Sequence, residues 1–450
     1  NKLYIQSYGC QMNFADSEVV ASILEAEGYT TTTDPQQANL ILINTCSIRE
    51  KAEQTVRKRI KDFKKNKRKN KDLIIGILGC MAERLKSKFL EEEKLVDLVI
   101  GPDAYRDLPK LIKKTQDGRK AVNVILSKEE TYGDINPIRL NSNGVTAFVS
   151  IMRGCDNMCS FCVVPFTRGR ERSRDPKSIL KEIQHLNKSG FKEVTLLGQN
   201  VDSYLWFGGG AKKDFKKKNT ITELTDFSTL LDTIASKNQN IRIRFSTSNP
   251  QDMKDDVLKT IAKHKNICNY IHLPVQSGSS KILQLMNRGH TREWYLDRIA
   301  SINKLIPNCG LSSDFITGFC DETEDDHQLT LSLMEEVKYN FSYMFYYSER
   351  PNTFAERQLK DNVAEQVKKR RLQEIISLQQ THSLLRNQEA IGNNYEVLIE
   401  GVSKKSEDKF FGRTTQNTVV VFNKKTADVG DFVNVKINRC TSATLIGEIT

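Results

Sequence analysis

The sequence predicts an α/β protein in three parts. These are a doubly wound parallel α/β domain over residues 1–118, a partial barrel of six β/α units over residues 140–375, and a small antiparallel β-barrel over residues 385–450. In the first two parts, short apolar runs rich in β-formers alternate with helical stretches, and that order favours parallel strands joined by crossover helices. In the last part, alternating runs are separated by Gly and Asn/Asp turns, which favours antiparallel strands.

The strands expected in the first domain are apolar enough to be buried on both faces of a sheet. They are the runs 3–9 (LYIQSYG), 40–45 (LILINT), 73–79 (LIIGILG) and 96–100. Helices are expected between and after these runs, over residues 15–27, 47–63 and 105–114.

The central part contains six strand-like runs, each followed by a helical stretch. The runs are 146–152, 193–197, 242–246, 270–273, 311–316 and 343–347. Active groups of such barrels lie at the carboxyl ends of the strands. In the C-terminal part, the expected strands include 395–399, 419–422 and 432–437.

Three cysteines stand close together directly after the first strand of the central part. They form the pattern Cys155-x3-Cys159-x2-Cys162, with Phe161 before the last cysteine. Closely spaced thiolates in one loop are typical iron–sulfur ligands, and three ligands leave one iron with an open position where chemistry can occur. The alternatives are chance clustering or a zinc loop closed by a distant residue.

A second set of three cysteines follows three strands of the first domain. Cys10, Cys46 and Cys80 each come one residue after an expected strand. Ligand sites of open α/β sheets lie just beyond the carboxyl ends of the strands, so the three thiols should converge on one crevice. The alternative is that each is a small buried hydrophobic residue.

Polar groups and glycines also follow several barrel strands. Gln199 lies in a Gly-Gln-Asn sequence, Ser248 in a Ser-Thr-Ser sequence and Gln276 in a Pro-Val-Gln-Ser-Gly sequence. Further along, Gly318 comes two residues after Ile316. These groups could hold a nucleoside and an amino-acid moiety, although polar loop residues are usually only solvated and a glycine can simply form a turn.

Composition limits the compartment and the partner. The ten cysteines in 450 residues form no paired framework of the kind found in small secreted domains. No apolar run approaches the length of a membrane span. We therefore expect a cytoplasmic protein without a membrane partner. The net charge of +12 favours a polyanionic partner. Two lysine-rich runs, 57–72 and 212–218, are either solvated surfaces or contacts to phosphate.

The C-x3-C-x2-C spacing resembles the radical S-adenosylmethionine superfamily, and the sequence from Ile316 through Gly318 to Glu322 resembles its adenine-side glycine motif. The order of the three parts resembles the methylthiotransferases, in which the last part is a TRAM domain that binds RNA. The residues around the first cysteine, Gly9-Cys10-Gln11-Met12-Asn13, resemble the MiaB-type subgroup of that family. Its other matching stretches are 164–169, 197–201, 272–278 and 286–292, whereas 318–321 and 348–353 depart from the family pattern.

The resemblance implies two 4Fe–4S clusters and S-adenosylmethionine. One cluster would be held by Cys155, Cys159 and Cys162, and an auxiliary cluster by Cys10, Cys46 and Cys80. The S-adenosylmethionine pocket would be lined by Phe161, Gln199, Ser248, Gln276, Ile316 and Gly318. The C-terminal barrel would contact RNA.

The implied activity is the addition of a methylthio group to carbon 2 of isopentenyladenosine beside the anticodon of tRNA. Such an enzyme also needs an electron donor and a sulfur or cluster-assembly donor. Two alternatives remain: a methylthiotransferase for threonylcarbamoyladenosine tRNA or a ribosomal protein, and a non-catalytic iron–sulfur RNA-binding protein.

Overall fold

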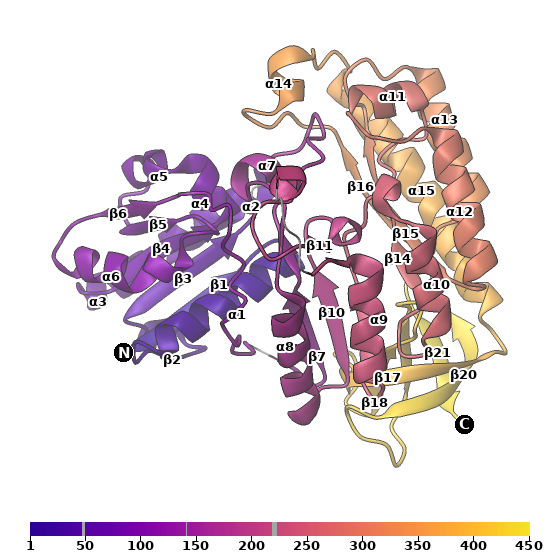
Figure 1. Ribbon diagram of the computed structural model, residues 1–450, viewed down its shortest axis with the longest axis horizontal. Coiled ribbons are helices and arrows are strands. Elements are labelled where there is room, and N and C mark those ends of the chain that lie inside the picture. The colour runs from indigo at the N-terminus through magenta and orange to yellow at the C-terminus, as the bar shows by residue number, and fades with distance from the viewer. Residues whose placement is uncertain (47–49, 141, 218–222) are drawn as a thin grey trace.

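The computed structural model describes residues 1–46, 50–140, 142–217 and 223–450 of the chain. The N-terminal sheet lies beside the central partial barrel, and the C-terminal barrel packs below the central part in the view of Figure 1. Among the described residues, none of the helices combines the length and the apolar character that crossing a membrane requires.

The N-terminal domain is built on a six-stranded parallel sheet in the order β2-β1-β3-β4-β5-β6. Its strands are β1 (Lys2–Ser7), β2 (Thr30–Thr31), β3 (Leu40–Thr45), β4 (Ile74–Gly79), β5 (Leu98–Ile100) and β6 (Ala121–Asn123). The four predicted strands are confirmed as β1, β3, β4 and β5. The two edge strands were not predicted, because each has only two or three residues and lacks an apolar run.

Helices cover both faces of this sheet, which confirms the doubly wound arrangement. They are α1 (Gln11–Glu25), α2 (Glu50–Asp62), α3 (Lys64–Lys69), α4 (Cys80–Leu85), α5 (Ser87–Glu92) and α6 (Leu108–Gln116), with short 3₁₀ turns η1 (Pro35–Gln37) and η2 (Tyr105–Asp107). Leu40 and Leu42 share a core with α1 and α6, while Ile41 and Ile43 share another core with α2 and α4. Burial on both faces explains the continuous apolar runs. Residues 47–49 of the helix predicted at 47–63 lie outside the described residues.

The central part is a partial barrel of six parallel strands in two groups, β7-β10-β13 and β14-β15-β16. The strands are β7 (Thr146–Ser150), β10 (Glu193–Leu197), β13 (Arg242–Phe245), β14 (Tyr270–His272), β15 (Gly310–Thr317) and β16 (Phe341–Tyr346). A parallel bridge between Ile243 and Ile267 links the two groups. All six predicted strands are confirmed.

Helices follow the barrel strands and enclose one large apolar core. They are α8 (Pro176–Lys188), α9 (Phe227–Lys237), α10 (Asp255–Lys263), α11 (Ser280–Leu285), α12 (Arg292–Leu305), α13 (Glu324–Val337) and α15 (Glu365–Glu389), with the short α7 (Val164–Thr167) and α14 (Phe354–Gln358) near the strand carboxyl ends. The remaining short elements are β8 (Met152–Arg153), β9 (Arg172–Ser173), β11 (Leu205–Trp206), β12 (Thr225–Asp226), η3 (Val201–Ser203), η4 (Lys212–Lys217) and η5 (Pro250–Asp252).

The C-terminal part is a closed five-stranded barrel in the order β17-β18-β19-β21-β20. Its strands are β17 (Asn394–Val402), β18 (Lys409–Arg413), β19 (Val419–Asn423), β20 (Phe432–Cys440) and β21 (Leu445–Ile449). The predicted small barrel is confirmed. One of its pairings, β19 with β21, is parallel, whereas the others are antiparallel.

The C-terminal barrel packs against the amino ends of central strands. Arg242, the first residue of β13, donates from Nη1 to the carbonyl oxygen of Arg413 at 3.0 Å, and Arg244 donates from Nη2 to that of Thr414 at 2.6 Å. Helix α15 packs along β16 and leads directly into this barrel. The C-terminal barrel therefore lies at the end of the central strands opposite to the cysteine loop.

Candidate active site

The loop that carries Cys155, Cys159 and Cys162 begins directly after β8. Gly154 has a φ of +77°, and a Cβ atom at this position would overlap the carbonyl oxygen of Arg170, so the tight turn before Cys155 requires glycine. The amide of Cys155 donates to the carbonyl oxygen of Gly169 at 3.2 Å, and that of Cys162 to the carbonyl oxygen of Cys159 at 3.0 Å. These bonds fold the loop back on itself and bring the three thiols together.

Two hydrogen-bond donors point at cysteine sulfurs of this loop. The backbone amide of Val164 donates to Cys162 Sγ at 3.4 Å. Arg288 Nη1 donates to Cys159 Sγ at 3.4 Å, and its Nη2 is fixed by the carbonyl oxygen of Pro274 at 2.7 Å. Thiolates that bind an iron–sulfur cluster accept hydrogen bonds of this kind.

The second set of cysteines lies at the carboxyl ends of three adjacent strands, as the sequence predicted. Cys46 directly follows β3, Cys80 directly follows β4 and begins α4, and Cys10 precedes α1 three residues after β1. A Cβ atom on Gly9, which has a φ of +108°, would lie 2.8 Å from Cys46 Sγ, so glycine here allows Cys46 to lie against the turn that carries Cys10.

Cys46 and Cys80 are buried, the three cysteines of the loop are half-buried, and Cys10 is exposed. Burial raises the pKa of Cys10, Cys155 and Cys162 above the ordinary value of a thiol, and the neighbouring thiols of the same set add to the rise. Solvent still reaches Cys10, although protein atoms surround it closely. A thiolate in such a place needs a compensating positive charge, which iron supplies on binding.

The two sets of cysteines face each other across the junction of the two domains. Arg168, which directly follows α7, donates from Nε to Cys80 Sγ at 3.1 Å, and its Nη1 lies 2.6 Å from Asp16 Oδ2. Helix α7 packs against α4, and the thiols of Cys162 and Cys80 are close enough to influence each other electrostatically. Figure 1 shows α7 lying between the N-terminal sheet and the barrel.

The residues present fit an iron–sulfur cluster at each set. Each set supplies three thiols and receives a hydrogen-bond donor from a basic side chain. Within the part of the chain that the structure describes, no three Cys, His, Asp or Glu side chains surround a single ion-sized point. A four-iron cluster binds each thiolate through a different iron atom and therefore uses a wider arrangement than a single ion does.

The polar groups predicted to hold a cofactor lie at the carboxyl ends of the barrel strands. Gln199 Oε1 accepts from the amide of Gly154 at 2.6 Å, which ties the end of β10 to the cysteine loop. Ser248 is buried, and its hydroxyl lies close enough to the Asp202 carboxylate to lower the pKa of that group. Gln276 has a φ of +77° and bridges to Phe315 of β15. Phe161 packs edge-on against Phe319 at 6.3 Å between ring centroids.

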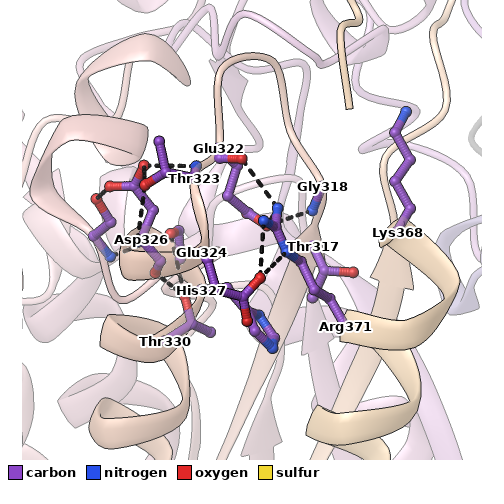
Figure 2. A network of polar contacts seen from close by, with 12 residues as sticks. Thr317, Gly318, Glu322, Thr323, Glu324, Asp326, His327, Thr330, Lys368 and Arg371 are labelled. Carbon is purple, nitrogen blue, oxygen red and sulfur yellow. Dashed lines mark hydrogen bonds and ion pairs between the residues drawn. The ribbon is translucent and has the colours of Figure 1, made fainter. Parts of the chain in front are cut away.

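Ile316 and Gly318 lie at the end of β15, next to a buried network that Figure 2 shows in detail. Gly318 has a φ of +67°, and its amide donates to Glu322 Oε1 at 2.7 Å. Arg371 of α15 donates to the same oxygen at 2.9 Å. A Cβ atom at residue 318 would overlap Lys368 Cγ. Gly318 therefore permits the close approach of α15, a role that the sequence did not predict.

Sequence reasoning missed three residues that contact the cysteine sets or support such a contact: Asp16, Arg168 and Arg288. Arg168 and Arg288 lie within stretches that resemble the methylthiotransferase pattern, and Asp16 follows the stretch around Cys10. For Asp16 and Arg168 the available signal was a charged residue six positions after a cysteine, whereas Arg288 is 129 residues from Cys159 and had no such signal. Their partners were not apparent, because Arg168 and Cys80 are 88 residues apart in the chain.

The basic run 57–72 is partly occupied by contacts within the domain. Arg57 pairs with Glu92 and Glu93, and Lys67 pairs with Asp97. Seven other basic residues of the run form no ion pair among the described residues: Lys58, Lys61, Lys64, Lys65, Arg68, Lys69 and Lys71. In the second basic run, Lys212 pairs with Glu171 at 3.0 Å, and residue 218 lies outside the described residues.

Three family models match successive parts of the chain. Residues 2–101 match a model described as uncharacterized protein family UPF0004, residues 149–334 match the radical SAM superfamily, and residues 388–450 match the TRAM domain.

The relatives that carry the name tRNA-2-methylthio-N(6)-dimethylallyladenosine synthase include proteins from three different bacteria. The one from Christiangramia forsetii is 65% identical over 99% of this chain and 93% of its own length. The one from Flavobacterium psychrophilum is 62% identical over 99% of this chain and 93% of its own length. The one from Karelsulcia muelleri is 56% identical over 100% of this chain and 99% of its own length.

Solved structures share the fold at low sequence identity. The radical S-adenosylmethionine methyltransferase TsrM from Kitasatospora setae has a TM-score of 0.55 and 12% identity, covering 76% of this chain and 72% of TsrM. The cobalamin-dependent S-adenosylmethionine radical enzyme OxsB has a TM-score of 0.51 and 16% identity, covering 84% of this chain and 56% of OxsB.

Proposed function

The chain belongs to the tRNA-2-methylthio-N(6)-dimethylallyladenosine synthase family, and we propose from its two cysteine sites how it performs that reaction. It is a radical S-adenosylmethionine methylthiotransferase that adds a methylthio group to carbon 2 of isopentenyladenosine (dimethylallyladenosine) in tRNA. Its cofactors are two 4Fe–4S clusters and S-adenosylmethionine. The observation that carries the assignment of residues is the presence of two three-thiol sites that face each other across one domain junction.

We assign Cys155, Cys159 and Cys162 to the cluster that binds S-adenosylmethionine. When bound there, that cluster supplies the electron that cleaves the cofactor to a 5′-deoxyadenosyl radical, as the target carbon–hydrogen bond is not open to acid–base chemistry. Residues at the strand carboxyl ends position the cofactor in this proposal. Gln199 fixes the turn before Cys155. Gln276 and the buried Ser248 present polar groups to the cofactor, and Gly318 presents its backbone to the cofactor at the end of β15.

We assign Cys10, Cys46 and Cys80 to the auxiliary cluster, which supplies the sulfur that is transferred. Their place at the carboxyl ends of β1, β3 and β4 puts the three thiols on the side of the sheet where α4 packs against α7 of the central domain, and there they would hold the auxiliary cluster. The chain's own contribution is to hold the sulfur donor and the radical source on opposite sides of the junction marked by Arg168.

The substrate base must leave the stack of the anticodon loop to reach this junction. A single-stranded loop allows this at low energetic cost, which suits an enzyme that modifies a nucleoside beside the anticodon. The C-terminal barrel packs at the other end of the central strands, so an RNA that touches both ends must extend along the central barrel. We further propose a cytoplasmic site of action, an electron donor that reduces the radical cluster, and a sulfur or cluster-assembly donor that restores the auxiliary site.

The test is a reductive assay of the reconstituted full-length chain under anaerobic conditions. The chain is incubated with S-adenosylmethionine and an anticodon stem-loop RNA that carries isopentenyladenosine, and the nucleosides are then analysed by mass spectrometry. The expected product is 2-methylthio-isopentenyladenosine together with 5′-deoxyadenosine. Methylthiolation of threonylcarbamoyladenosine RNA or of a ribosomal protein, with none of the isopentenylated RNA, would refute the proposal.

A further inference from the structure

A buried network of charged side chains joins the N-terminal domain to the central barrel. Its members are Asp16, Asp103, Arg153, Arg168 and Arg172, none of which is more than 8% exposed. Arg168 Nη1 and Arg153 Nη1 lie 2.6 and 2.9 Å from the two oxygens of Asp16. Arg172 contacts Asp103, and Arg153 Nε lies 3.8 Å from the same carboxylate.

The network holds one more positive charge than it holds negative charges. It contains three guanidinium groups and two carboxylates, and no other carboxylate among the described residues forms an ion pair with these arginines. Each arginine contacts one of the two carboxylates, but the network as a whole keeps a buried net positive charge, which is costly. An anionic group beside the network would neutralise that charge.

The excess charge is directed at the auxiliary site through Arg168. One of its nitrogens, Nε, donates to Cys80 Sγ at 3.1 Å, and a second, Nη1, is held by Asp16. The third, Nη2, is buried and has no hydrogen-bond partner among the described residues. A thiolate-ligated cluster at Cys10, Cys46 and Cys80 would bring the negative charge and the additional acceptor that the guanidinium lacks.

We propose that Arg168 is a positioning residue of the auxiliary cluster: it fixes Cys80 across the domain junction and stabilises the electron-rich states of that cluster. This inference rests on the proposed assignment of Cys10, Cys46 and Cys80 to a cluster. Hydrogen bonds and positive charge at the sulfurs of an iron–sulfur cluster favour its reduced form and raise its reduction potential. The same charge favours retention of the anionic sulfur that the reaction transfers.

Asp16 has a defined part in this arrangement. Because it holds Nη1 of Arg168 while also pairing with Arg153, it fixes the plane of the guanidinium and so the direction of Nε toward Cys80. Lysine in place of Arg168 would keep the charge but would lose this forked geometry.

The radical cluster site has its own arginine, which provides a matched control. Arg288 donates to Cys159 Sγ at 3.4 Å, and its Nη2 is held by the carbonyl oxygen of Pro274. Both arginines belong to the central domain, but each contacts a sulfur of only one set in the described structure. Substitution of either one should therefore change the potential of its own cluster alone.

The experiment measures the reduction potential of the auxiliary cluster in the full chain in which Cys155, Cys159 and Cys162 are replaced by Ala. In this background, Arg168→Gln, Arg168→Lys and Arg288→Gln are compared by redox titration monitored by electron paramagnetic resonance. Iron and sulfide analysis of each preparation reports cluster content separately from potential. Absence of iron in the background itself would refute the assignment of the auxiliary cysteines, a failure distinguishable from that of the role of Arg168.

We expect Arg168→Gln to make reduction at least tenfold less favourable, which is about 59 mV for one electron, with iron content retained. Arg168→Lys should give an intermediate potential, and Arg288→Gln should leave the potential unchanged. If Arg168→Gln fails to retain its cluster, the Lys variant decides. The proposal is overturned if the iron-loaded Arg168→Gln variant has the same potential as the unsubstituted background. If Arg168→Gln does not load iron, the same result in Arg168→Lys overturns it.

Discussion

The side chain of Lys368 fills the space that a Cβ atom on Gly318 would need, so α15 lies directly over the end of β15. Lys368 Nζ is held there by both oxygens of Asp361 at 2.6 Å and by the carbonyl oxygen of Tyr347 at 3.2 Å. The glycine that resembles a cofactor-binding motif thus also serves the packing of a helix that begins 47 residues later in the chain, at Glu365.

Gly318→Ala should destabilise the protein more than a glycine replacement that meets only conformational strain. The positive φ alone costs about 1–2 kcal/mol for a residue with a Cβ atom, and the overlap with Lys368 adds to this cost. Gly190→Ala is the matched control, because Gly190 has a φ of +91° and no atom lies within 4 Å of the point that its Cβ atom would occupy. Thermal unfolding measures both variants. Equal losses of stability would contradict the role given to Lys368.

Iron and sulfide content tests the number of clusters. The anaerobically reconstituted chain should contain about eight iron and eight sulfide ions, as two 4Fe–4S clusters require. Replacing Cys155, Cys159 and Cys162 by Ala should halve both values and abolish the formation of 5′-deoxyadenosine. A value near four in the unsubstituted chain would exclude the second cluster.

Asp202 should make stability depend on pH. Burial raises its pKa to about 8, and this effect outweighs the lowering effect of contacts from the Ser248 hydroxyl and the backbone of Asn249. Between about pH 4 and pH 8 the unfolded chain loses this proton while the folded chain retains it. The free energy of unfolding therefore falls by up to about 1.4 kcal/mol for each unit by which the pH rises. Asp202→Asn removes this dependence.

The comparison requires thermal unfolding of the unsubstituted chain and Asp202→Asn at about pH 5 and about pH 7, two values inside the window in which only the folded chain keeps the proton. The variant should gain stability relative to the unsubstituted chain at the higher pH, whereas the exposed control Glu91→Gln should not. Parallel changes in the Asp202 variant and the unsubstituted chain would show that this carboxyl group is ionised in the folded protein at both pH values.

The exposed part of the basic run should contribute little to RNA binding. Asn66 donates to the carbonyl oxygen of Pro35 ahead of β3, and Lys67 pairs with Asp97 ahead of β5, so this part lies at the amino ends of the strands. The cysteines lie at the carboxyl ends, about 20 Å away for strands of six residues.

Replacing Lys64, Lys65, Arg68 and Lys69 by Gln should therefore leave the slope of log affinity for tRNA against log salt concentration unchanged. Removal of one interaction with a phosphate group would lower that slope by somewhat less than one unit. A lower slope in this variant would assign the run to the RNA interface.

Much of the fold and the cysteine sets could be predicted because the signals are local. Each of Cys46 and Cys80 directly follows a buried strand, and the parallel sheet brings the ends of such strands together. The contacts of Arg168 with Cys80 and of Gly318 with Lys368 join residues that are far apart in the chain. They depend on how the domains and α15 pack, which strand and helix periodicity does not encode. The parallel pairing of β19 with β21 was missed for a similar reason, since it depends on how the barrel closes.

The central claim is that the two three-cysteine sites perform separate tasks. The most direct test replaces Cys10, Cys46 and Cys80 together by Ala and measures two products in one reductive assay with isopentenylated anticodon stem-loop RNA. The variant should still form 5′-deoxyadenosine, because Cys155, Cys159 and Cys162 are intact, and should form no methylthiolated RNA. Methylthiolated RNA from this variant would contradict the assignment of the N-terminal cysteines as the site of the sulfur donor.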